Sequence, residues 1–536
     1  MNSMAAHFLI LIPFLGAALA AAWPGRLSQA RPWLLPATAV VHAGLAVWLL
    51  VNPPVVGARA WIGFDAVARA TLPAVSLLFL ACSAYGVAYL RARAERPNRM
   101  FTVLLLLLLG LLSAGLQARH LGLLWIATEA LTLATVPLLH FAGTSRAVEA
   151  TWKYLLVGGT GIALSLLGSF ALGYASLHGG GEGDLTFGSL MAQGAGLSRP
   201  WVLIAWVLLL VGYGTKMGLA PMHTWKPDAY GEAPGIVGAI LAGGVTTVAF
   251  TALLRVRAVV DAAGEGGVAG RTLMVIGLFS MLVAALFLLG TRDFKRMLAY
   301  SSVEHMGILV IAASLGAAGV WAALFHVWTN GLTKGALFLS AGNMRRAAGT
   351  SSLEVARGMS AVTPRSAAVF VAGMFAVTAC PPFGPFFSEL RIVLAAFAGG
   401  HGITAGLFLG CLLFAFFGMS RVVFAVVDGR ARSERDRTGK TGESREKKLR
   451  VPESNGTVMP ALALLGLSLC LGLATPAVLQ EAWTNAVASL TPQRIESEPG
   501  REASPRPPLP PEIEDLDPIS SPDMCPASKQ QGVTAP

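Results

Sequence analysis

Charged residues are few in this 536-residue sequence. Asp, Glu, Lys and Arg make up 13% of the chain and the mean hydropathy is +0.63, whereas a soluble globular protein carries about 25% charged residues. The deficit excludes an ordinary soluble enzyme and a disordered chain. The net charge of +11 would suggest nucleic-acid binding in a soluble protein, but in so apolar a chain it is interpreted first against a membrane.

Cysteine is also scarce. The five cysteines are Cys82, Cys380, Cys411, Cys470 and Cys525, and the closest two lie 31 residues apart. The sequence has no CxxC motif and no Cys/His cluster. This spacing does not suit a disulfide scaffold, an iron–sulfur cluster or a zinc site. We therefore predict no metal site and interpret the cysteines as small apolar side chains.

Long apolar runs, in contrast, are abundant. A helix that crosses a bilayer needs about 20 mostly apolar residues. The first run follows Met1 without a basic segment or a good cleavage site, so we interpret it as a retained helix and not as a signal peptide. The sequence predicts an all-α polytopic membrane protein of about 14 transmembrane helices. The runs are roughly 5–22, 32–52, 70–90, 100–118, 121–142, 152–176, 201–222, 234–254, 272–290, 297–314, 317–341, 366–398, 402–427 and 457–479.

The cations predict the orientation of these helices. If the N-terminus lies outside, the inward loops carry 25 of the 40 Lys and Arg residues and the outward loops carry seven. Cytoplasmic loops are rich in Lys and Arg, so the count favours an outside N-terminus, and an even number of helices then puts the C-terminus outside as well. We expect the chain in the inner (plasma) membrane of the cell. No nucleic-acid partner is expected, because orientation explains most of the positive charge.

Two similar intervals predict an internal repeat. Glu129 lies 87 residues before Lys216, and Glu304 lies 85 residues before Glu389. Each interval leads from an acid in one helix to an ionisable residue at a Pro/Gly break two helices later. Five helices, an odd number, separate the corresponding members, so two inverted five-helix repeats with broken helices are predicted. The expected organisation is N-terminal helices at 1–99, a first repeat at 100–256, a second at 270–427, a charged cytoplasmic loop at 428–456, a last transmembrane helix at 457–480 and a disordered tail at 492–536.

Five ionisable residues inside apolar runs form the candidate pathway. An ionised side chain in the middle of a bilayer costs about 3 kcal/mol, so it faces protein or water and usually has a partner. For each residue a structural role is the alternative: a buried hydrogen-bonded acid, a lysine that extends to the membrane surface, or a Glu paired with a loop Arg. The five residues are Glu129, Lys216, Glu304, Lys334 and Glu389.

Two helix breaks accompany the pathway. Lys216 lies between glycines and shortly before Pro221, and Glu389 follows Pro381 and Pro382. An interrupted helix in a membrane is tolerated where it lines a cavity, and it frees backbone carbonyls for water or ions. Burial beside such a break disfavours the charged form of a lysine, and a nearby carboxylate favours it. A proton carrier needs that balance.

A polar stripe lies in the run at 317–341. His326, Asn330 and Lys334 are four residues apart, which places them on one helical face. A polar stripe on an apolar helix suits a hydrated proton wire, although a lone buried His is more often structural. Glu304 and His305 lie near the start of another helix, and a structural role is a stronger alternative for them.

Five stretches carry a resemblance to a known family. They are TEALTLATVPL, TKMGLAPMHTWKPDAYGEAP, KRMLAYSSVEHMG, HVWTNGLTKGALFLSAG and PPFGPFFSEL, in order over roughly residues 100–427. The sequence resembles the antiporter-like proton-translocating subunits of respiratory complex I, whose relatives occur in multisubunit Na+/H+ antiporters and membrane-bound NiFe hydrogenases. AYSSVEHMG and PPFGPFFSE look most like the F-type membrane subunit of hydrogenase-4.

The resemblance implies a role for each pathway residue. Glu129 would modulate Lys216, and Lys216 would be the switching carrier of the inward half-channel. Lys334 with His326 would form the central relay, and Glu389 the terminal relay of the outward half-channel. The chain itself would bind no cofactor, and quinone, iron–sulfur or NiFe chemistry would lie in partner membrane subunits of a complex I-like or hydrogenase assembly.

The sequence departs from the family pattern at two places. Many relatives have a lysine in the helix after the first break, where this chain offers Thr247 or Thr246. A second histidine of some relatives is replaced by Asn330. A hydroxyl relays a proton through water but holds no charge. Thr247 and Asn330, with Glu304 and His305, are therefore secondary relay candidates.

The sequence-based hypothesis is a proton-translocating subunit that couples electron transfer in an NADH-quinone oxidoreductase or hydrogenase complex to proton pumping. Approach of Glu129 would favour protonated Lys216, and its withdrawal would send the proton through His326 and Lys334 to Glu389. A Na+/H+ antiporter subunit or stand-alone secondary transporter is the main alternative, and a scaffold that has lost transport is the third. The sequence leaves the electron donor, the acceptor and the coupling ion open.

Overall fold

The described residues are all helical. The computed structural model describes the chain except residues 1, 58, 94–95, 142, 429–452 and 492–536, and the described part contains helices but no strand. This confirms the all-α class. The predicted tail at 492–536 and most of the predicted charged loop at 428–456 lie outside the described residues.

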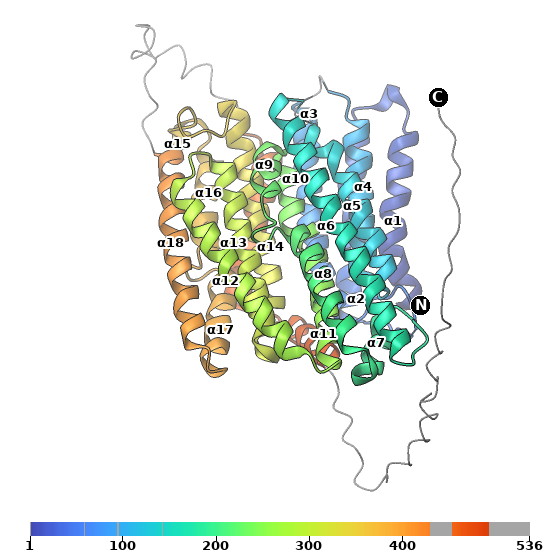
Figure 1. The fold of residues 1–536 in the computed structure, drawn as a ribbon. Coiled ribbons are helices and arrows are strands. Elements are labelled where there is room, and N and C mark those ends of the chain that lie inside the picture. The colour runs from blue at the N-terminus through green and yellow to red at the C-terminus, as the bar shows by residue number, and fades with distance from the viewer. Residues whose placement is uncertain (1, 58, 94–95, 142, 429–452, 492–536) are drawn as a thin grey trace, which may run out of the picture. The chain divides into compact units, whose positions relative to one another are not determined.

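The helices run side by side as a bundle, with the N-terminal helices on the right and α16 to α18 on the left in Figure 1. Short helices or turns at 187–193, 241–245 and 359–362 connect or interrupt the longer ones. The longer helices and the two that follow helix breaks are α1 (Asn2–Ala22), α2 (Leu34–Val51), α3 (Ala66–Arg91), α4 (Arg99–Gln117), α5 (Leu121–His140), α6 (Ser145–His178), α8 (Arg199–Met217), α9 (Trp225–Glu232), α10 (Gly235–Ile240), α11 (Thr246–Ala262), α12 (Gly266–Gly290), α13 (Phe294–Ser314), α14 (Gly316–Ala348), α16 (Pro364–Val377), α17 (Gly384–Ala398), α18 (Gly402–Val427), α21 (Asn455–Leu473) and α22 (Ala477–Leu490).

Twelve helices of the described part are long and apolar enough to cross a membrane, with α10, the π-helical turn at 241–245 and α11 counted as one. Two further passages are not among these twelve helices. α14 is 33 residues long but carries the polar stripe, and the run at 366–398 is divided into α16 and α17. The expected number of about 14 passages is therefore confirmed. α22 was not expected from the sequence; its Trp483 is fully buried against Trp321, Phe325 and Trp328.

The first helix break follows Lys216. α8 ends at Met217, and Gly218 adopts φ +77°, a left-handed conformation that favours glycine. A Cβ atom at Gly218 would also lie 2.7 Å from Cδ of Lys226, so the glycine makes room for that side chain. Pro221 follows and lacks the N–H that a continuing helix needs. The predicted run at 201–222 is therefore helical only to Met217.

The second break separates α16 from α17 at Pro381 and Pro382. Ala379 has φ 54°, and the described residues contain no other non-glycine residue with positive φ. α9 lies toward the upper end of the bundle and α17 toward the lower end (Figure 1). The second break lies in the fifth passage after the one that contains the first break, and five is an odd number. The arrangement agrees with two units of opposite orientation, whose residue limits stay predictions.

Small residues allow close packing in both units. A Cβ atom at Gly212 of α8 would lie 2.7 Å from the backbone oxygen of Gly161 in α6. In the second unit, a Cβ atom at Gly307 of α13 would lie 2.7 Å from the backbone oxygen of Gly277 in α12. Small residues let transmembrane helix backbones approach closely, which increases van der Waals contact where lipid supplies no hydrophobic driving force.

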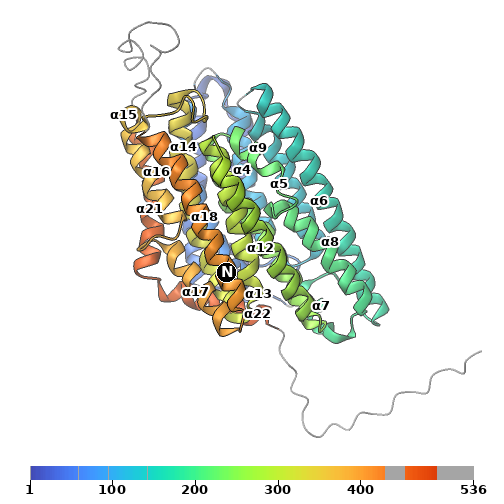
Figure 2. The same cartoon turned by 60° about the vertical axis from the view of Figure 1, so that its left-hand side comes forward.

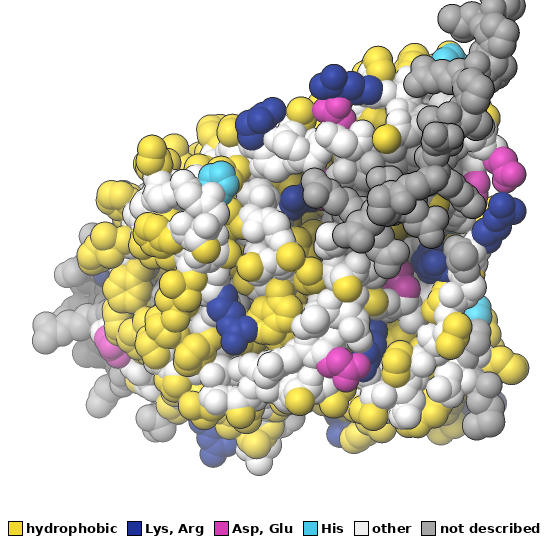
Figure 3. All heavy atoms as spheres, turned by 90° about the horizontal axis from the view of Figure 1, so that it is seen from below, with side chains coloured by type: hydrophobic (Ala, Val, Ile, Leu, Met, Phe, Trp, Pro, Cys, Tyr) yellow, Lys and Arg dark blue, Asp and Glu magenta, His cyan; other side chains and the backbone are white. Residues whose placement is uncertain are grey.

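The bundle has a buried centre and an apolar outside. The most apolar window of 235–262 is entirely buried, whereas less than half of the corresponding windows of α6, α12 and α18 is buried. Those three helices lie on the outside (Figures 1 and 2) and expose leucine and phenylalanine side chains. Figure 3 shows the lower end, where hydrophobic side chains predominate and charged ones are scattered. An apolar outer surface of this extent suits lipid contact.

An ion pair fixes the central helix to α3. Arg255 of α11 donates to both carboxylate oxygens of Asp65, at 2.5 and 2.9 Å, and to the backbone oxygen of Leu116. Asp65 also caps α3 by accepting from the backbone N–H of Ala68. The Arg255 side chain is only 6% exposed, so it depends on this partner.

Substitution of Asp65 is expected to destabilise the fold strongly. Asp65→Ala leaves the Arg255 guanidinium buried without its carboxylate, and loss of one partner from a buried pair costs about 3–5 kcal/mol. Thermal unfolding in detergent measures the effect. The matched control is Glu182→Ala, which removes the exposed partner of Arg59 and should leave the unfolding temperature nearly unchanged. Equal unfolding temperatures for the two variants would contradict this assignment.

Candidate functional site: a buried polar axis

The axis begins at Lys216 near the end of α8. Its side chain is 1% exposed, and Nζ donates hydrogen bonds to Oγ1 of Thr132 in α5 and, at 2.9 Å, to the hydroxyl of Tyr154 in α6. Nζ also lies 4.7 Å from the centre of the Tyr154 ring. The lysine is therefore held by two hydroxyl groups and an aromatic face.

Glu129 lies beside this lysine but does not pair with it. It occupies the same face of α5 as Thr132, three residues earlier, which is close to one helical turn. Its side chain is half-buried, and Oε2 has no hydrogen-bond partner. The ion pairs found within 4.0 Å among the described residues do not include Glu129 with Lys216. The charge of Lys216 nevertheless acts on the Glu129 carboxyl group electrostatically.

Lys226 of α9 is a buried lysine that the sequence argument did not recognise. It is 0% exposed, and Nζ donates to the backbone oxygen of Met217 at 2.6 Å and to that of Ser302 in α13 at 3.3 Å. Its Nζ also lies 5.5 Å from the ring centre of Tyr230. Counting it as a cation of an inward loop was wrong, because packing against α13 buries it.

Lys334 of α14 continues the axis in the second unit. Its side chain is fully buried, and Nζ donates to Oγ of Ser301 in α13 at 2.6 Å. The charges of Glu304 and Glu389 act on it electrostatically, although neither carboxylate lies within the 4.0 Å of an ion pair in the described structure. Glu304 itself is buried.

Two histidines connect three helices beyond Lys334. Nδ1 of His305 lies 3.0 Å from Nε2 of His326, and Nδ1 of His326 lies 2.8 Å from Oγ of Ser388 in α17. Because the Ser388 hydroxyl donates to the backbone oxygen of Pro385, Nδ1–H of His326 donates to Oγ of Ser388, and Nε2 of a neutral His326 accepts from Nδ1–H of His305. Glu389 lies at its end, with Oε1 3.9 Å from His305 Nδ1, and neither of its oxygens has a hydrogen-bond partner.

Most of the predicted residues lie along the axis, whereas the two threonines do not join it. Glu129, Lys216, Glu304, His305, His326, Lys334 and Glu389 lie along the axis. His305, predicted as a secondary candidate, supplies the second histidine from α13. Asn330 is buried on the stripe of α14, but its Oδ1 has no hydrogen-bond partner.

The threonines after the π-helical turn do not join the axis in the described structure. Thr246 donates to the backbone oxygen of Ala242, and Thr247 donates to that of Gly243. Both hydroxyl groups are therefore used within their own helix. Their selection as relay candidates relied on sequence position, which does not show where a hydroxyl hydrogen goes.

The same row of side chains has the composition of a metal site. His305, His326 and Glu389 are the one group of three His, Cys, Asp or Glu residues in the described chain whose ligand atoms all lie within 4.8 Å. However, His305 Nδ1 and His326 Nε2 already share a hydrogen bond that a metal would break. Lys334 adds a positive charge that acts on both rings.

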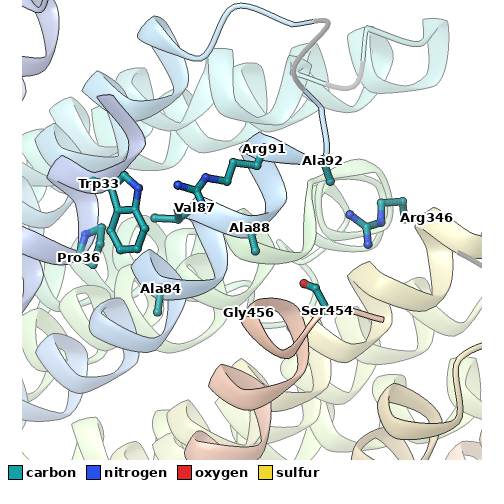
Figure 4. Close-up of a pocket in the computed structure, with 10 residues that line it drawn as sticks. All are labelled: Trp33, Pro36, Ala84, Val87, Ala88, Arg91, Ala92, Arg346, Ser454 and Gly456. Carbon is teal, nitrogen blue, oxygen red and sulfur yellow. The ribbon is translucent and has the colours of Figure 1, made fainter. Parts of the chain in front are cut away.

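One cavity lies away from the axis. It has a volume of about 910 Å3 and is lined mainly by apolar residues between α2, α3, α14 and α21 (Figure 4). Arg91, which stacks over Trp33, and Arg346 lie at its edges. None of the axis residues lines this cavity. The axis residues Lys216, Lys226 and Lys334 are buried.

Comparison with known proteins supports the fold and the motifs. Residues 118–415 match the family NADH:quinone oxidoreductase/Mrp antiporter, TM. The hydrogenase-4 component F homolog of Methylacidiphilum infernorum is 36% identical over 304 residues, which cover 56% of this chain and 64% of that relative. NADH-quinone oxidoreductase subunit N of Desulforudis audaxviator is 32% identical over 363 residues, which cover 66% of this chain and 70% of the relative.

A solved structure has the same fold at low sequence identity. A chain of the membrane-bound sulfane sulfur reductase, an archaeal respiratory membrane complex, superimposes with a TM-score of 0.79 at 23% identity, over 91% of this chain and 98% of that chain. The family match covers more than half of the sequence and includes the axis residues from Glu129 to Glu389. This chain belongs to the NADH:quinone oxidoreductase/Mrp antiporter family of multi-pass membrane proteins.

Proposed function

We propose that this chain is a proton-translocating membrane subunit of a complex I-like NADH-quinone oxidoreductase or NiFe hydrogenase complex. The main supporting observation is that Lys216 and Lys334 are both buried and donate to hydroxyl oxygens, and that no carboxylate of the described residues lies within 4.0 Å of either Nζ. Hydroxyl groups both donate and accept hydrogen bonds, so each of these lysines contacts a group that suits a proton relay.

The proposed cycle begins with Glu129. When its carboxylate approaches Lys216, Coulomb attraction in a medium of low dielectric favours the ammonium form, and Lys216 takes one proton from the cytoplasmic side. Withdrawal of Glu129, driven by a neighbouring subunit, removes that attraction. The ammonium of Lys216 then releases the proton and becomes a neutral amine.

The second unit carries the proton outward. Lys334 accepts it, and the row Ser388–His326–His305 provides hydrogen-bonding groups from α17 across α14 to α13, with Glu389 beside His305. Glu389 becomes a neutral carboxylic acid when it receives the proton. Release to the outside restores its carboxylate, and the charge of a newly protonated Lys334 favours that restored form.

The proposed setting is the inner (plasma) membrane, with both termini outside. The cations around α9 support this orientation: Arg345 pairs with Glu232, and Asp228 pairs with both Lys153 and Arg296. These residues lie at the end of the bundle that carries most Lys and Arg, which is the cytoplasmic end by the positive-inside rule. Partner membrane subunits would hold any quinone, iron–sulfur or NiFe centre.

A Na+/H+ antiporter subunit is the second candidate, because Glu304 and Glu389 both act on Lys334. A sodium site needs several oxygen ligands, whereas the nearest neighbours of Glu389 include two imidazole rings. Sodium-dependent proton transport by the isolated chain in liposomes would favour this candidate. Transport that requires electron transfer and ignores sodium would support the redox-driven subunit.

Removal of the Lys216 ammonium tests the proposed function. Lys216→Ala should abolish proton uptake by the complete complex in liposomes, since the inward half would lose its carrier, while the complex still assembles. A pH-sensitive dye measures uptake, and native electrophoresis measures assembly. Lys153→Ala is the control, because Lys153 is half-exposed at the bundle end. Wild-type uptake by Lys216→Ala would contradict the proposal.

The histidine row supplies a second test. His326→Leu removes both hydrogen bonds of the ring, so proton uptake should fall by about a hundredfold, the scale of a lost acid–base group. The control is His42→Leu, which removes another buried histidine bonded to a serine, Ser113, between α2 and α4. If both variants pump equally well in the assembled complex, the row has only a structural role.

A further inference from the structure

Lys226 occupies the connection between the two units. Its first acceptor is the backbone oxygen of Met217, the residue directly after Lys216. Its second is the backbone oxygen of Ser302, the residue directly after Ser301, whose hydroxyl holds Lys334. One buried ammonium therefore contacts the chain next to the carrier of the first unit and next to the carrier of the second.

The surroundings of Lys226 contain no compensating acid at contact distance. Among the described residues, no carboxylate lies within 4.0 Å of its Nζ. The groups around it are two backbone oxygens, the ring face of Tyr230 and the glycine at 218. A permanently charged, fully buried ammonium without a nearby carboxylate is an unfavourable link between two backbone segments. The free energy cost of its desolvation exceeds the free energy gained from two hydrogen bonds to carbonyl oxygens.

Other side chains offer no comparable connection. The hydroxyl groups of Thr246 and Thr247 bond within their own helix. Lys295 is equally buried, but it donates to the backbone oxygens of Gly231 and Ala233 after α9 and contacts neither carrier segment. Lys226 alone among the described lysines bonds to the segments of both carriers.

We propose that Lys226 is a proton carrier that connects the two half-channels, between Lys216 and Lys334. One proton leaves the ammonium of Lys216, which becomes a neutral amine, and converts the neutral amine of Lys226 into an ammonium. In the next step Lys226 returns to the neutral amine, and Lys334 becomes the ammonium. The flexible four-carbon stem lets the amine move between the two sides, and Gly218 leaves the space for it.

The inference rests on the proposed function. Two substitutions distinguish proton transfer by Lys226 from a structural role of this side chain. Lys226→Gln keeps N–H donors for the carbonyl oxygens without a charge, and Lys226→Arg keeps donors with a permanent charge. Neither side chain takes up and releases a proton in the working range. Both variants should lower proton uptake per electron transferred by about tenfold or more, in the complete complex in liposomes with a pH-sensitive dye.

Lys295→Gln is the matched control, because it changes a second buried lysine bonded to two carbonyl oxygens. Its complex should pump normally once assembled. Full pumping by either Lys226 variant would overturn the proposal, since a hydrogen-bonding tie would then suffice. If one variant does not assemble, the other decides. Absence of pumping by the wild-type complex would instead overturn the proposed function, so the two failures are distinguishable.

Discussion

The cost of placing charge in a membrane interior governs the rest of this structure. Ionised groups there need polar partners from the protein itself. The chain meets this need with neutral oxygens: Thr132 and Tyr154 hold Lys216, backbone oxygens hold Lys226, and Ser301 holds Lys334. None of these acceptors is a carboxylate, and the ion pairs of the described residues include none of the three lysines.

The helix breaks supply some of these polar partners. An unbroken helix uses its backbone oxygens internally, whereas the end of α8 leaves the oxygen of Met217 free for Lys226. The break after α16 lets α17 begin at Gly384, which places Ser388 against His326 and Glu389 near His305. Loss of helical hydrogen bonds thus creates polar positions at the depth where the carriers lie.

Much of the arrangement could be predicted from the sequence, and the remainder depended on three-dimensional packing. Apolar runs identified the passages, and charges within them identified Lys216, Lys334 and Glu389. Lys226 was missed because a lysine beside Asp228 in a polar stretch has the pattern of a loop, and only packing against α13 buries it. Asn330 and Thr247 were chosen by helical position, which fixes a face but not a hydrogen-bond partner. The α22 helix follows too closely on α21 to give a separate apolar run.

The carrier of the first unit is a lysine, Lys216, and the last carrier of the second unit is a glutamate, Glu389. The two ends of the axis therefore differ in which protonation state is neutral. A lysine without its proton is neutral, and a glutamate with its proton is neutral. Transfer of one proton from the ammonium of Lys216 to the carboxylate of Glu389 therefore removes two buried charges at once, which a low-dielectric interior favours. The reverse transfer creates two buried charges. In the proposed cycle this loss of buried charge works against the higher proton affinity of an amine than of a carboxylate, and the coupling energy recharges Lys216 and Glu389 at the two ends.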